Sequence, residues 1–203
     1  MRDSLPAPAA TMTQFLLALF STVLINNFVL QWPLGVDPLL QADGSNRQRV
    51  HALGLATTVL MLLSSVLGHV LYRGLLQPWG LAALQLFIWL PLSLLLIKPL
   101  LRLLSRALPR LPFEGLWPLL LGNAGMLGLL LIGARDDLDL ATLSAMSLGA
   151  GLGFWLALSL FSDLRQRIST NDIPLPWRGL PIDLISAGLM AVAFFGFNGL
   201  IKT

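Results

Sequence analysis

The chain has 203 residues, of which 56% are hydrophobic and only 11% are charged, and its mean hydropathy is +0.78. This composition excludes an ordinary soluble fold, whose surface would need many more charged side chains. The formal net charge is +3, but the basic residues occur singly between apolar runs, which excludes a nucleic-acid surface. There is no cysteine, so the chain alone forms neither a disulfide nor a thiolate metal site.

Six apolar segments follow one another along the chain, each close to the roughly 20 residues that a membrane-spanning helix needs. They cover about 13–34, 50–72, 79–101, 113–134, 140–161 and 180–201. The links between them are too short to hold a folded domain outside the membrane. The N-terminal lead lacks the charge pattern of a signal peptide, so we expect the first segment to be retained as a span. The sequence therefore predicts an all-α integral membrane protein with six transmembrane helices in a single membrane domain, 1–203.

The arginines predict the orientation of these spans. The links after the first, third and fifth segments contain Arg47, Arg49, Arg102, Arg106, Arg110, Arg165, Arg167 and Arg178. The opposite side contains only Arg2, Arg73, Arg135 and Lys202, with three aspartates close to Arg135. The positive-inside rule places the first group in the cytoplasm. We therefore expect a multi-pass protein of the cell inner membrane with both termini on the periplasmic side.

The first segment is interrupted near its end, in the stretch LINNFVLQWPLGVDP at 24–38. Two adjacent amides, Asn26 and Asn27, are followed by Pro33, a glycine and Pro38. Proline removes a backbone donor, and glycine allows backbone angles that are closed to other residues. Backbone groups freed in lipid must be satisfied by protein or by a water-filled cavity. The stretch therefore predicts a half-helix that ends inside the membrane, and a candidate site beside it.

The second half of the chain contains a similar set of features. The fourth segment opens with Trp117 and a proline and contains GNAGMLG at 122–128. Each interrupted span is followed by a span with closely spaced glycines, GLATT at 54–58 and GAGLG at 149–153. Because each half has three spans, the two halves have opposite orientations in the membrane.

The chain is therefore predicted to form an inverted 3+3 repeat with broken half-helices in spans one and four. Repeat one covers about 13–101 and repeat two about 113–201. Interrupted inverted repeats place a binding site near the middle of the bilayer, at the interface between the repeats.

The polar residues in this region have two interpretations each. An unsatisfied amide in hydrocarbon is costly, so Asn26, Asn27 and Asn123 should each find a partner inside the bundle. They either join helices or line a pore or a cofactor. Asp37 either needs a partner or a proton within the membrane, or is an ordinary turn residue at the surface.

The remaining candidates favour structural roles. His51 and His69 lie near span ends, where an interfacial position is expected instead of a catalytic or metal-binding one. Glu114 and Asp183 lie at span starts, where a carboxylate caps a helix N-terminus. The glycines at 149–153 follow no strand, so they indicate close helix packing and not a nucleotide loop. No motif supports catalysis by this chain alone.

Four ordered segments resemble the RnfA/NqrE family, the six-span subunits of the Rnf and Na⁺-pumping quinone reductase complexes. They are LINNFVL at 24–30, GLATT at 54–58, DIPLPWRG at 172–179 and SAGLMAVAFFGFNGL at 186–200. The resemblance is closer to the RnfA side and implies the inverted 3+3 fold. It also implies a homologous partner of opposite topology, and an iron–sulfur cluster that the two subunits share near the midplane. Electron transfer through that cluster would be coupled to ion movement.

The chain departs from the family at both cluster cysteines. The family places one in a leucine-glycine-x-cysteine-proline turn, where this chain has Asp37, and the other after an asparagine, where this chain has Ala124 following Asn123. Such clusters are normally held by four thiolates. We therefore expect the family's architecture without its usual cluster, with Asp37 as a candidate proton or cation site.

Together these observations predict a membrane subunit of an Rnf-type ion-translocating electron transport complex, a translocase in which this chain is not catalytic alone. Its expected partners are the other Rnf-type membrane subunits, above all the opposite-topology homologue, within the lipid bilayer and without nucleic acid. Two alternatives are a small-solute transporter or channel on the same scaffold and a structural protein that only supports assembly. Copurification with flavin-bearing subunits would distinguish the first prediction from the transporter.

Overall fold

The structure is a computed structural model that describes residues 12–25, 27, 46–169 and 173–196, and every regular element in these ranges is helical. The longer elements are α1 (Met12–Phe20), α4 (Arg47–Leu71), α5 (Gln85–Ala107), α6 (Trp117–Leu121), α7 (Gly125–Arg135), α8 (Leu140–Ser169) and α9 (Leu180–Phe195). The short turns η1 (Ser21–Ile25) and η2 (Tyr72–Leu76) are π-helical, and η3 (Ala82–Leu84) and η4 (Leu175–Trp177) are 3₁₀.

Four helical stretches in the described ranges are long and apolar enough to cross a membrane: Arg47–Leu76, Ala82–Ala107, Trp117–Arg135 and Leu140–Ile168. Two shorter apolar helices, Met12–Leu24 and Leu180–Phe195, match the first and last predicted segments. These six stretches confirm the prediction of an all-α, multi-pass membrane protein. Much of the predicted first span, including its Pro/Gly break, lies outside the described residues.

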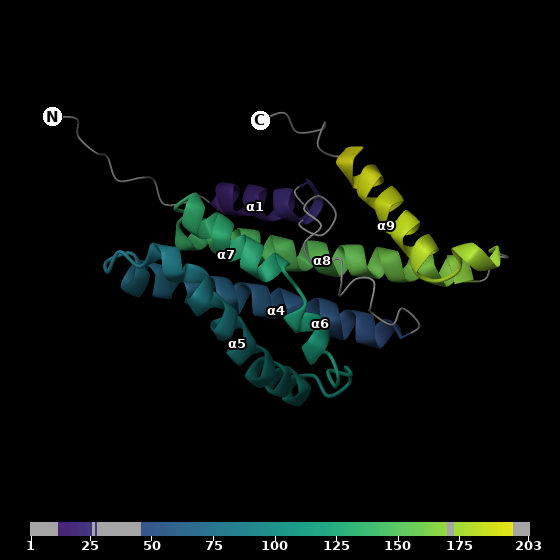
Figure 1. Cartoon of the computed structure of the whole chain (residues 1–203), viewed down its shortest axis with the longest axis horizontal. Helices are drawn as coiled ribbons and strands as arrows, with labels where there is room; N and C mark the ends of the chain where they lie inside the picture. The colour runs from purple at the N-terminus through teal and green to yellow at the C-terminus, as the bar shows by residue number, and fades with distance from the viewer. Residues whose placement is uncertain (1–11, 26, 28–45, 170–172, 197–203) are drawn as a thin grey trace.

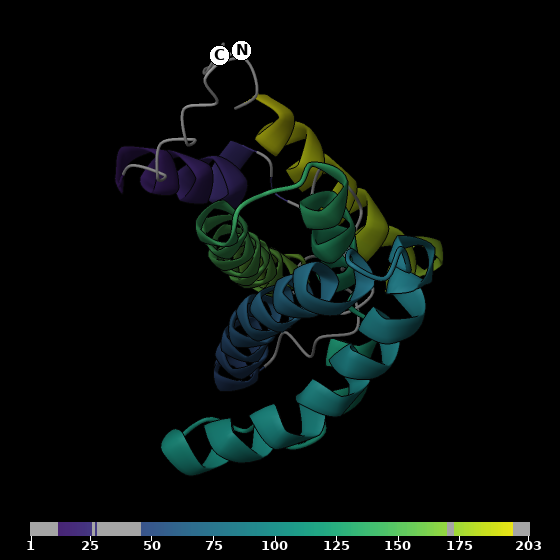
Figure 2. The ribbon, with the colours of Figure 1, turned by 90° about the vertical axis from the view of Figure 1, so that its left-hand side faces the viewer.

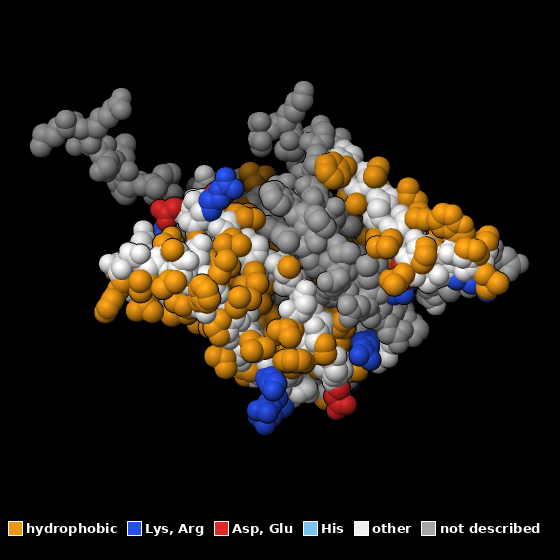
Figure 3. All heavy atoms as spheres, in the orientation of Figure 1, with side chains coloured by type: hydrophobic (Ala, Val, Ile, Leu, Met, Phe, Trp, Pro, Cys, Tyr) orange, Lys and Arg blue, Asp and Glu red, His pale blue; other side chains and the backbone are white. Residues whose placement is uncertain are grey.

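The centre of the fold is an antiparallel pair made by α4 and α8 (Figure 1). Helix α1 and turn η1 pack on α8, and α7 packs against both members of the pair. Figure 2 looks nearly along this pair and shows α5 leaving it at a steep angle, while α9 diverges on another side. Hydrophobic side chains cover much of the outer surface in Figure 3, as expected for a protein surrounded by lipid.

Glycines allow α4 and α8 to approach closely. A Cβ atom added to Gly151 of α8 would lie 2.4 Å from the Cα atom of Thr58 on α4. A Cβ atom on Gly54 of α4 would lie 2.4 Å from the indole ring of Trp155 on α8. On each helix, a glycine therefore makes room for a larger residue of the other helix. Close van der Waals packing of this kind joins helices in lipid, where no hydrophobic driving force acts between them.

The two outer glycines of the same motif face the first span. A Cβ atom on Gly149 would lie 2.7 Å from the carbonyl oxygen of Leu19, and one on Gly153 would lie 3.0 Å from that of Val23. The predicted use of this motif for close helix packing is therefore confirmed. The middle glycine and the outer pair serve opposite faces of α8.

Two helices extend well past the apolar segments predicted for them. Helix α8 continues to Ser169, past the predicted end at 161, and α5 covers Gln85–Ala107 where 79–101 was expected. In both cases arginines extend the helix beyond the apolar run, because long polar side chains favour helix as strongly as many apolar ones do. The length of the apolar run therefore predicts how much of a helix lies in the hydrocarbon layer, and not where the helix ends.

Candidate functional site

The predicted break in the fourth span is present. Helix α6 ends at Leu121 and α7 begins at Gly125, so that Gly122, Asn123 and Ala124 separate two short helices. The backbone N–H of Gly122 donates to the Pro118 carbonyl oxygen at 3.0 Å, which closes the last turn of α6. The Asn123 side chain then starts the next helix, because its Oδ1 atom accepts a hydrogen bond of 3.0 Å from the backbone N–H of Gly125.

Asn123 is the residue in this break that has functional potential. It is 4% exposed, and its Nδ2 group has no hydrogen-bond partner among the described residues. A buried donor without an acceptor costs free energy unless water, another protein chain or a ligand satisfies it. The Nδ2 group of Asn123 therefore needs an acceptor from outside the described residues, and its lining of a pore or a cofactor stays a prediction.

Asn27 joins two helical segments, which is the other interpretation of these amides. Its side chain is fully buried, and its Nδ2 group donates to the carbonyl oxygen of Gly153 at 2.9 Å and to that of Val23 at 3.1 Å. It therefore joins the end of the first span to α8. Asn26 and Asp37 lie outside the described residues. The structure gives Asn27 and Asn123 different partners on different helices, and no hydrogen bond joins them.

The position that the resemblance assigns to a cluster ligand does not fit an iron–sulfur cluster. Ala124 is the N-cap residue of α7, and its methyl group has no atom that can bind iron. The chain has no cysteine, and the described residues contain no group of three or more side chains that could hold a metal ion. Thiolates are the usual ligands of such clusters.

Two buried hydroxyl groups on α4 extend the polar interior, and the sequence analysis did not identify them. Thr57 and Ser65 lack a side-chain hydrogen bond within the described part of the chain, whereas the hydroxyl of Thr58 donates to the Gly54 carbonyl oxygen at 2.8 Å. Helix α4 packs against both α6 and α7, the two halves of the broken span. Paired hydroxyl residues inside an apolar span are the sequence signal that could have indicated them.

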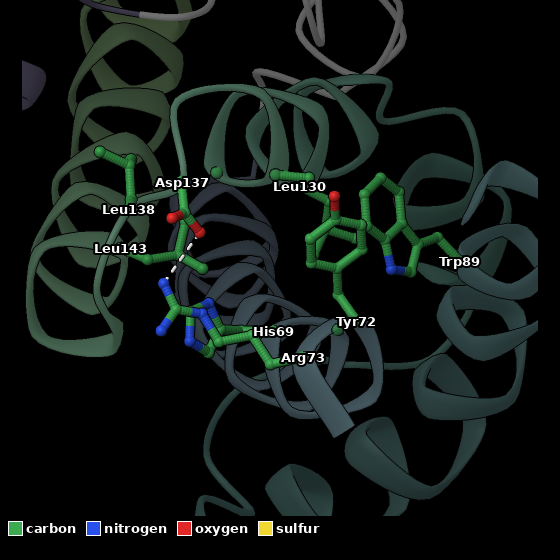
Figure 4. A pocket seen from close by; sticks show the side chains of 11 residues that line it. His69, Tyr72, Arg73, Trp89, Leu130, Asp137, Leu138 and Leu143 are labelled. Atoms are coloured by element: carbon green, nitrogen blue, oxygen red, sulfur yellow. Dashed lines mark hydrogen bonds and ion pairs between the residues drawn. The ribbon is translucent and has the colours of Figure 1, made fainter. Parts of the chain in front are cut away.

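A small, partly open cavity of about 10 Å³ lies at the C-terminal end of α4, which is room for a single water molecule (Figure 4). His69 lines it together with Arg73, whose guanidinium forms an ion pair of 2.9 Å with Asp137. The buried indole N–H of Trp89, also in the lining, has no hydrogen-bond partner among the described residues.

The other histidine, His51, accepts a hydrogen bond at Nδ1 from an indole N–H of α8 at 3.0 Å.

The two predicted caps have different outcomes. Asp183 lies in the first turn of α9 as predicted, is 6% exposed and accepts a hydrogen bond of 2.7 Å from the Arg165 guanidinium. The prediction for Glu114 is wrong, because α6 begins only at Trp117 and no acidic residue lies in its first turn. Glu114 instead lines a surface pocket beside α5.

Comparisons with known proteins agree with this architecture. Residues 15–201 match the family described as Rnf-Nqr subunit, membrane protein. The RnfA subunit of the ion-translocating oxidoreductase complex of Shewanella sp. (strain W3-18-1) is 36% identical over 195 residues, covering 94% of this chain and 100% of the relative. The RnfA subunit of Shewanella denitrificans is 38% identical over 201 residues, and that of Hahella chejuensis 36% over 193, both with the same coverage. The chain therefore belongs to the Rnf-Nqr family of membrane subunits.

Proposed function

We propose that this chain is the RnfA subunit of an Rnf-type ion-translocating oxidoreductase complex, where it forms part of the membrane passage that couples electron transfer to ion movement. The observation that supports this most strongly is the match to RnfA relatives along their whole length. The broken fourth span agrees with it, since the buried Nδ2 group of Asn123 has no hydrogen-bond partner among the described residues of the membrane domain. Its partners are the other subunits of the complex.

The architecture of the proposal is an inverted 3+3 repeat, with repeat one at about 13–101 and repeat two at about 113–201. Helices α4 and α8 are the second spans of the two halves, and their contacts are reciprocal. Gly54 of α4 receives Trp155 of α8, and Gly151 of α8 receives Thr58 of α4. Such reciprocity is expected where a pseudo-two-fold axis relates two repeats. Both termini are then periplasmic, in a protein of the inner membrane.

The proposal includes a homologous partner of opposite topology but no usual iron–sulfur cluster between the two subunits. Ala124 provides no ligand, and the partner's two thiolates alone would leave the normal set of four incomplete. The test is to purify the complex through this chain and to measure iron and the electron paramagnetic resonance signal. A stoichiometric cluster assigned to the interface between this chain and its homologue would refute this part of the proposal.

Ion coupling is tested separately in proteoliposomes that contain the whole complex. Asn123→Leu removes the buried amide at the break, so we expect slower ion uptake per electron transferred while the subunits still copurify. Asp37→Asn tests the proposed proton or cation site in the same assay. Unchanged coupling in both variants would contradict a passage at this site.

A transporter or channel on the same scaffold is the second candidate, favoured by the buried hydroxyl groups of Thr57 and Ser65, which have no hydrogen-bond partner among the described residues. It predicts a homo-oligomer that copurifies without flavin-bearing subunits. Finding those subunits, together with the homologue, in a purification through this chain excludes it.

A further inference from the structure

A pocket of about 300 Å³ opens at the surface between the second half of α5 and the loop that precedes α6. Lys98 and Arg102 line it from α5, and Phe113 and Trp117 line it from the loop and from the start of α6. The Lys98 ammonium lies 5.8 Å from the centroid of the Trp117 ring, a cation–π distance. The pocket therefore combines two positive charges with an aromatic wall.

The charges that line this pocket are positive on balance. Neither Lys98 nor Arg102 belongs to any ion pair formed within the described residues. Behind the pocket, a guanidinium nitrogen of Arg49 lies 3.4 Å from the position of a Cβ atom on Gly115, and the buried Nε group of Arg49 lacks a hydrogen-bond partner in the described part. One acidic side chain, Glu114, lines the exposed edge. The balance of charge is therefore positive.

The position of the pocket along the chain places it at a membrane face. Lys98 lies within the candidate span Ala82–Ala107, and residues 108–116 form the link to the next candidate span. A lysine in an apolar span extends its charge toward the headgroup layer. Leu94 and Leu95, one turn before Lys98, are 43% and 71% exposed and offer an apolar surface to a lipid chain. In Figure 3 basic and acidic side chains lie at the lower edge of a largely hydrophobic face.

We propose that this pocket binds the phosphate group of an anionic phospholipid from the surrounding bilayer. Lys98 and Arg102 are neighbours on one helix face, one turn apart, so both can bind the same phosphate. Trp117 contacts the glycerol region, with Phe113 buried behind it, and an acyl chain follows the apolar surface of α5. The positive balance selects an anionic headgroup over a zwitterionic one. This inference requires only that the chain spans a membrane, so it stands independently of the proposed function.

The test is native mass spectrometry of the full-length chain in detergent, titrated with phosphatidylglycerol or phosphatidylcholine. Three variants are compared with the unmodified chain: Arg102→Gln, Lys98→Gln with Arg102→Gln, and Arg106→Gln. Arg106 is an exposed basic residue of α5 outside the pocket and serves as the matched control. Each basic residue that contacts the phosphate in the pocket is expected to contribute about fivefold in affinity, so we expect a loss of about 25-fold for the double variant.

The expected result is preferential binding of phosphatidylglycerol that falls stepwise in the single and double pocket variants and persists in Arg106→Gln. Thermal unfolding without added lipid checks that each variant is folded, and the single variant tests the proposal if the double one does not fold. Equal binding of both lipids, or an equal loss in Arg106→Gln, would overturn the proposal. Full competition by inorganic phosphate would indicate a site for a free anion instead. Absence of lipid binding to the unmodified chain would also overturn the proposal. Loss of partner subunits in a separate purification of the complex through the double variant would then indicate a site for an acidic protein segment.

Discussion

Replacing Gly151 by alanine should force the central helices apart. The new Cβ atom would lie 2.4 Å from the Cα atom of Thr58, whereas ordinary contacts begin at 3.4 Å, so α4 and α8 must separate by about 1 Å at this point. The obstacle is backbone, which no rotamer change can move. Overpacking of this kind costs about 1–3 kcal/mol, and the separation also weakens the neighbouring contact between Gly54 and Trp155.

Gly188→Ala in α9 is the matched control, because a Cβ atom there has no neighbour within 4 Å. Both substitutions gain the same helix propensity, roughly 1 kcal/mol, so the difference between them isolates the cost of packing. Thermal unfolding of the purified full-length chain measures this difference, with a shift in Tm of about 2–4 °C for each kcal/mol. If Gly151→Ala is as stable as Gly188→Ala, the close approach of α4 and α8 is refuted.

Two further predictions concern the carboxylates. Asp183→Asn weakens the 2.7 Å hydrogen bond to Arg165, so α9 should lose about 1–3 kcal/mol of local stability. Hydrogen exchange measured by mass spectrometry should then show faster exchange of the α9 amides. The control Asp136→Asn, in an exposed turn, should leave this exchange unchanged. Hydrogen bonding from the Thr142 side chain holds the pKa of Asp139 below its ordinary 3.8, so this carboxylate stabilises the start of α8 fully above that pH and loses its effect as pH falls through the lower, folded value. Asp139→Asn should remove this acid dependence from thermal unfolding curves between about pH 5 and pH 2, and an unchanged curve would contradict it.

The features that were predictable from the sequence are local ones. Apolar length gives the spans, and the break in the fourth span follows from GNAG at 122–125, because a glycine ends one helix and the Asn123 side chain accepts a hydrogen bond from the first backbone N–H of the next. The pair Gly149 and Gly153 indicated a close helix contact before its partner was known. Neither π-helical turn has a comparable signal in the sequence. Each is only five residues long, STVLI and YRGLL, which is too short to show a change in the helical period.

The features that were not predictable depend on residues far apart in the chain. The sequence left the same two roles open for all three asparagines, but Asn27 reaches a carbonyl oxygen 126 residues away, while the Nδ2 group of Asn123 has no partner in the described part. Asp183 was expected to interact with its own helix, yet its partner is Arg165 at the end of α8. Such partners are fixed by how the helices cross, and a single sequence does not encode that crossing in any local pattern.

The reciprocal fit of α4 and α8 limits how this protein can change shape. Sliding or rolling of either helix would drive the Trp155 ring or the Thr58 backbone into the opposite main chain. The two helices are therefore expected to move together as one rigid body. If the proposed ion passage opens and closes, the motion is therefore expected in the outer segments, such as the fourth span with its interruption at Gly122–Ala124.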